Sequence, residues 1–116
     1  MQKKIFDIEA KCLKLIVNFF IGYSFDELNE WLSKNKYDEL DEELREGVGI
    51  FFNQSKNNLR LYGISIHEFS LNRKSLCILI HELHHLVDAQ CKYKGIDDGE
   101  VKAYLIEYYF NEFLNK

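Results

Sequence analysis

Every odd-numbered position in residues 13–21, LKLIVNFFI, is apolar. This period of two, carried by β-branched and aromatic side chains, is typical of a β-strand. Residues 3–9, KKIFDIE, suggest a further strand that forms the first arm of a hairpin. A helix over residues 5–20 is an open alternative, because apolar residues in that stretch also recur at helical spacing.

A short helix is predicted for residues 25–34. Ser24 and Glu27 have the spacing of a capping box, in which two side chains bond each other's backbone N–H groups at the start of a helix. Apolar residues then follow at helical spacing and form one stripe, which consists of Phe25, Leu28, Trp31 and Leu32. The cap and the stripe together indicate an amphipathic helix.

Two strand-like segments, residues 48–54 and 59–67, lie on either side of the sequence SKNN, which suits a hairpin turn. In the second segment the apolar positions change from odd to even numbers at Gly63. A glycine at such a change predicts a β-bulge.

The last part of the chain predicts two helices, from about residue 72 to 93 and from Asp97 or Asp98 to about Leu114. At about 100° per residue, six apolar residues of the first helix share one arc that should face the sheet. They are Leu76, Leu79, Ile80, Leu83, Leu86 and Val87. The order of elements predicts an α+β fold: a small antiparallel sheet with the long helix and the C-terminal helix packed on one face.

One domain over residues 1–116 is expected, because a chain of this length with 47% apolar residues can bury one core. The 15 basic residues are scattered and the net charge is −4, which argues against a nucleic-acid partner. The longest apolar stretch near the N-terminus, residues 15–23, is far shorter than the ~20 residues that span a membrane. Three cysteines without CxxC spacing indicate reduced thiols in a cytoplasmic protein.

The sequence HELHH at residues 81–85 holds three of the four histidines. His81 and His85 project from one face of the predicted helix, one turn apart, so that two imidazoles can share a zinc ion. Glu82 lies beside them and can hold a metal-bound water. The alternative is the solvated face of an ordinary helix, where histidine and glutamate need no explanation. The mid-helix position and the apolar flanks of the motif favour zinc binding.

A catalytic zinc site needs a third protein ligand and an open position for water. Cys91 is rejected because it would point about 120° away from His85 along the same helix. An acid on the last helix is the other option, and its polar stripe includes Glu100 and Glu107. Glu100 is preferred, because it lies in the first turn, closest to the loop that reverses the chain.

The combination of HELHH with the downstream sequence GEVKAY resembles the gluzincin metallopeptidases. At this chain length it resembles minigluzincins and the small metallopeptidases encoded by phages and prophages. The repressor-cleaving ImmA/IrrE-type peptidases are more distant relatives by the same motif. The resemblance covers residues 59–110, about half of the chain.

The resemblance implies a catalytic zinc ion held by His81, His85 and Glu100, with Glu82 as the general base. Zinc would activate a water molecule, and Glu82 would pass its proton to the leaving amine. The resemblance also implies that the strand at residues 59–67 is a sheet edge that pairs with an extended protein or peptide substrate.

Three further residues have expected roles near such a site. Tyr104 is the candidate donor to the oxyanion, with a packed aromatic side chain as the alternative. Asp88 is the candidate acceptor of a hydrogen bond from a site histidine, with a surface pair to His84 as the alternative. His84 itself is expected to be a neighbour of the site and not a ligand.

Two functions from different classes follow. The first is a cytoplasmic zinc metallopeptidase. The second is a phage-type binding or inhibitor protein with a zinc fold, which acts through its cleft or edge strand without cleavage. Glu82 favours the peptidase, because a binding protein does not need a general base. An α+β domain without metal is a third interpretation.

Overall fold

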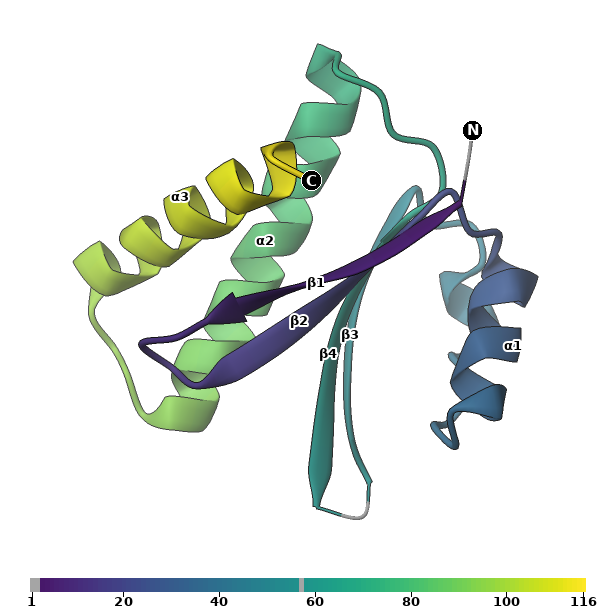
Figure 1. The fold of residues 1–116 in the computed structure, drawn as a ribbon, viewed down its shortest axis with the longest axis horizontal. Helices are drawn as coiled ribbons and strands as arrows, with labels where there is room; N and C mark the ends of the chain where they lie inside the picture. The colour runs from purple at the N-terminus through teal and green to yellow at the C-terminus, as the bar shows by residue number, and fades with distance from the viewer. Residues whose placement is uncertain (1–2, 57) are drawn as a thin grey trace.

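The computed structural model describes residues 3–56 and 58–116, which form a four-stranded sheet and three α-helices (Figure 1). In chain order the elements are β1 (Lys4–Ala10), β2 (Leu15–Ile21), α1 (Phe25–Lys34), the 3₁₀ helix η1 (Glu42–Leu44), β3 (Gly49–Lys56), β4 (Leu59–Ile66), α2 (Arg73–Lys94) and α3 (Gly99–Leu114). The predicted α+β class is confirmed, and the helical alternative for residues 5–20 is excluded. The predicted turn SKNN includes Asn57, which lies outside the described residues.

The sheet has the strand order β1-β2-β4-β3. Both predicted hairpins are present, since β1 pairs with β2 and β3 pairs with β4 in antiparallel register. The two hairpins join through β2 and β4, which run parallel from Val17 opposite Tyr62 to Ile21 opposite Ile66. The sheet is therefore mixed, and not wholly antiparallel as predicted. After β2 the chain forms α1 and β3 and then returns beside β2 as β4, in the same direction.

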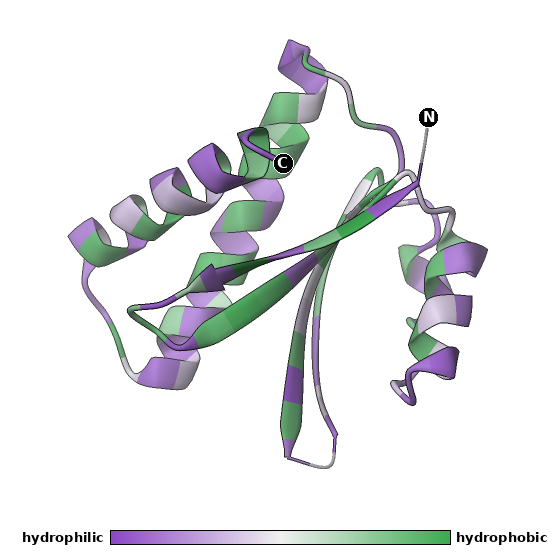
Figure 2. Cartoon of the chain, in the orientation of Figure 1, coloured by the Kyte–Doolittle hydropathy of each residue, from purple (hydrophilic) through white to green (hydrophobic). Residues whose placement is uncertain are grey.

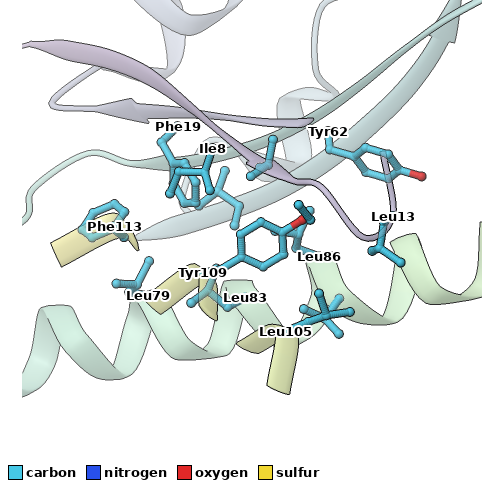
Figure 3. Close-up of a cluster of buried hydrophobic side chains, with 14 of the residues drawn as sticks. Ile8, Leu13, Phe19, Tyr62, Leu79, Leu83, Leu86, Leu105, Tyr109 and Phe113 are labelled. Carbon is cyan, nitrogen blue, oxygen red and sulfur yellow. The ribbon is translucent and has the colours of Figure 1, made fainter. Parts of the chain in front are cut away.

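Helices α2 and α3 cover one face of the sheet, as predicted, and α1 covers the other (Figure 1). The main core lies beneath α2 and α3, where the ring of Tyr109 extends between Leu83, Leu86 and the strands (Figure 3). Figure 2 shows β2 as mainly apolar and α2 as alternating apolar and polar bands, as expected for a helix that buries one face. Of the six residues predicted to face the sheet, Leu79, Leu83, Leu86 and Val87 are fully buried, whereas Ile80 is exposed.

Strand β4 is buried on both faces, because all six residues from Leu61 to Ile66 are buried. A strand covered on both sides carries apolar residues at odd and even positions alike. The register with β3 runs unbroken from Gly49 opposite Ile66 to Lys56 opposite Leu59. The bulge predicted at Gly63 is therefore wrong. The glycine instead makes room for Phe52, because three ring atoms of Phe52 lie within 2.7 Å of the position that a Cβ would take.

Each of the three α-helices begins at a side-chain cap. Ser24 and Glu27 form the predicted capping box of α1, and the Lys3 ammonium helps to lower the pKa of Glu27 to about 2. Asn72 caps α2, and Asp98 caps α3 through the backbone N–H groups of Glu100 and Val101. Within residues 3–56 and 58–116, no helix combines the length and the apolar character needed to cross a membrane.

Candidate metal-binding and catalytic site

One row of side chains on α2 faces the strand β3. Ile78, Glu82 and His85 follow one another along this row at helical spacing. A Cβ atom on Gly49 would lie 2.6 Å from Cγ2 of Ile78 and 3.1 Å from Oε2 of Glu82. Gly49 therefore allows β3 to pass directly over the helix at the glutamate of the HELHH sequence.

The imidazoles of His81 and His85 meet at their Nε2 atoms. These atoms are at hydrogen-bonding distance, 3.2 Å, and the ring centroids are 4.7 Å apart with the planes at 82°. Two nitrogens that each lie 2.0–2.1 Å from a tetrahedral zinc ion are about 3.3 Å apart. The observed separation thus fits two ligands of one zinc ion.

Glu82 is only 6% exposed, although it lies on the polar side of the helix. Burial raises the pKa of its carboxyl group, and the nearby His81 and His85 act in the opposite direction. The backbone N–H of Phe51 in β3 also lowers this pKa. A buried carboxylate next to two imidazoles is placed to accept a proton inside the site.

These groups line a single open cleft of about 360 Å³ between α2, the start of β3 and η1. Its lining consists of Glu43, Leu44, Gly47, Gly49, Ile50, Phe51, His81, Glu82 and His85. A second cavity of about 400 Å³ lies at the start of α2 and shares Gly47 with the cleft. The two cavities therefore lie on either side of Gly47, just before the N-terminal end of β3.

The edge strand beside the cleft is β3, and not the predicted strand at residues 59–67. That segment forms β4, which is paired on both sides, with β2 and with β3. The prediction of an edge at residues 59–67 is wrong, because the parallel pairing with β2 moves β4 into the interior of the sheet. In the described sheet, β1 and β3 are the edges.

The helix that carries Glu100 flanks the histidine face without completing it. Asp88, on the same arc of α2 as the histidines, lies 3.8 Å from the ammonium of Lys102 in α3. The Glu100 side chain is exposed and makes no hydrogen bond or ion pair with any described residue. Among residues 3–56 and 58–116, no three histidine, cysteine, aspartate or glutamate side chains form a group that could hold a metal ion.

Tyr104 and Asp88 have contacts other than those expected of them, and His84 lies beside His85 on α2. Tyr104 is 61% exposed and stacks on Tyr108, whose hydroxyl donates to the backbone carbonyl of Glu9 in β1. Tyr104 therefore does not line the cleft, because the side of α3 that carries Tyr104 and Tyr108 faces β1. Asp88 pairs with Lys102 and not with a histidine, and His84 is exposed without a hydrogen bond or ion pair to the described residues. Cys91, which was rejected as a ligand, is a buried free thiol in the core.

Gly49 and Phe51 are the site residues that the sequence did not predict. Their only sequence signal is the glycine pair in GVGIFF, residues 47–52, directly before an apolar strand. Glycines at such a position are compatible with a close approach of the backbone to another element. The identity of that element depends on the sheet order, which the local sequence does not contain.

No protein-family model, curated protein or solved structure matches the chain. The chemistry of the cleft is defined by its own residues: two facing imidazoles, a buried carboxylate and the edge of a sheet.

Proposed function

We propose that the protein is a zinc-dependent metallopeptidase that hydrolyses peptide bonds of a protein substrate in this cleft. The observation that carries the proposal is the 3.2 Å separation of the His81 and His85 Nε2 atoms, next to the buried Glu82 carboxylate. The match to the ligand spacing of tetrahedral zinc supports these two histidines as metal ligands.

Glu82 is the general base in the proposed mechanism. When bound, zinc would act as a Lewis acid that polarises the scissile carbonyl and lowers the pKa of water to about 7. Glu82 accepts one proton of the attacking water, whose oxygen forms the new bond to the carbonyl carbon. Glu82 then returns the proton to the amine nitrogen as the carbon–nitrogen bond breaks. The close packing of Glu82 against β3 at Gly49 holds the carboxylate in place for both transfers.

The proposed substrate is an extended segment of a protein. Strand β3 is an edge of the described sheet and lines the cleft with Gly49, Ile50 and Phe51. An extended chain can add to such an edge through main-chain hydrogen bonds, which supply affinity without a demand for a particular sequence. The three cysteines are free thiols, which supports a cytoplasmic site of action.

A phage-type binding or inhibitor protein is the second candidate function. The described residues contain no group of three ligand-type side chains arranged to hold a metal, and this favours it, because a binding surface needs no complete catalytic centre. The burial of Glu82 against β3, next to the two histidines, favours the peptidase, because a glutamate without a partner is rarely buried.

Glu100 is proposed as the third zinc ligand, because its carboxylate is unpaired and its helix flanks the histidine face. We expect Glu100→Ala to weaken zinc binding by more than the ~10–100-fold loss typical of outer partners of a metal site. Glu107→Ala, on the same helix, is the matched control and should bind zinc as the wild type does. Competition with a chromophoric chelator measures both affinities.

Glu43→Ala belongs in the same series, because Glu43 lines the cleft with the two histidines. Loss of zinc from the Glu43 or the Glu107 variant, with normal binding by the Glu100 variant, would contradict the proposed ligand set.

A further inference from the structure

Two adjacent phenylalanines of β3 point to opposite faces of the sheet. Phe52 is buried in the core beneath α1, where its ring lies 5.9 Å from that of Phe20. Phe51 faces α2, and its ring lies 6.4 Å from the imidazole of His85, with the planes 18° apart. The two side chains therefore have the same chemistry and separate environments.

Phe51 packs beside one of the reactive groups of the cleft. Its ring lies nearly parallel to the imidazole of His85, and both side chains line the cleft. His85 is otherwise exposed on α2, where an imidazole can occupy several rotamers. The ring of Phe51 limits the space open to this imidazole, whose Nε2 lies 3.2 Å from Nε2 of His81.

We propose that Phe51 is a positioning residue of the cleft, whose ring holds the imidazole of His85 in the orientation that places its Nε2 next to that of His81. This inference rests on the proposed zinc site, since it assigns the edge strand the task of orienting one of the zinc ligands. A ligand already held in its binding rotamer loses less conformational entropy when the metal binds. Removal of the ring should therefore weaken metal binding without unfolding the protein.

Phe51→Ala is expected to weaken zinc binding by ~10-fold, within the range typical of residues that orient metal ligands. Phe51→Tyr keeps the ring and should retain the wild-type affinity. Phe52→Leu is the matched control: it should lower the melting temperature through the core and leave zinc affinity unchanged. Equal zinc affinity for Phe51→Ala and the wild type, by chelator competition, would overturn the proposal.

A second measurement separates this proposal from the zinc site itself. In the metal-free protein, the ring current of Phe51 should shift the His85 imidazole signals in proton–carbon NMR spectra. Phe51→Ala should move these signals and leave those of His67 unchanged, because His67 bonds the Tyr23 carbonyl instead. Unchanged His85 signals would overturn the positioning role. Shifted signals in a protein that binds no zinc would support the contact and reject the metal site.

Discussion

Glu82→Gln should reduce peptide hydrolysis by ~10²–10⁴-fold, the range typical of losing general acid–base catalysis. Glutamine keeps the size of the side chain and can still hydrogen-bond a water molecule, but it cannot accept a proton from it. Zinc content should stay at the wild-type level, because the proposed ligands on α2 are His81 and His85. Mass spectrometry of a proteome-derived peptide library, incubated with each zinc-loaded protein, measures the cleavage products.

Glu112→Gln is a suitable control for this experiment, because Glu112 lies near the end of α3 and does not line the cleft. It should cleave the library as the wild type does. Equal cleavage by the zinc-loaded Glu82→Gln variant would contradict the role of Glu82. Identical peptide patterns with and without the zinc-loaded wild type would instead favour the binding protein.

Gly63→Ala should lower the free energy of unfolding by ~1–3 kcal/mol, the usual cost of adding a methyl group to a packed core. The new Cβ would overlap the ring of Phe52, which is only 6% exposed and cannot swing into solvent. Urea unfolding measures the change. Gly99→Ala is the matched control, because nothing lies within 4 Å of its Cβ position. It should be neutral or slightly stabilising, since alanine is the better helix former.

Phe52→Leu tests the cause of the Gly63 effect. The smaller side chain should leave room for the new methyl group, so the double variant should be more stable than the sum of the two single losses predicts. Side chains in direct contact typically couple by 0.5–3 kcal/mol. Additive losses would show that Phe52 is not what the glycine accommodates.

Local sequence signals were sufficient for the individual elements of the fold. The period of two in residues 13–21, the capping box at Ser24 and the arc of leucines on α2 are short-range patterns, and each marks an observed strand or helix. The pairing of β2 with β4 depends on contacts between segments about 45 residues apart. No local pattern encodes that pairing. Because the prediction lacked the pairing of β2 with β4, it placed β4 at the edge of the sheet and a bulge at Gly63.

The candidate site also has parts that local spacing predicts and parts that depend on distant contacts. Helical spacing places His81 and His85 one turn apart on the same side of α2, and the structure brings their Nε2 atoms together. The burial of Glu82 depends on β3 passing over α2 at Gly49, which is a contact between distant segments. The position of Tyr104 could not be predicted either, because it depends on how α3 turns toward β1.

The zinc content of the purified, zinc-reconstituted protein tests the central claim most directly. Native mass spectrometry should show one zinc ion per chain in the wild type and in His84→Ala, whose imidazole is outside the proposed ligand set. His81→Ala and His85→Ala should each lose the metal, because each removes one of the two facing imidazoles. A wild-type protein that retains no zinc, or stoichiometric zinc in both histidine variants, would contradict the account.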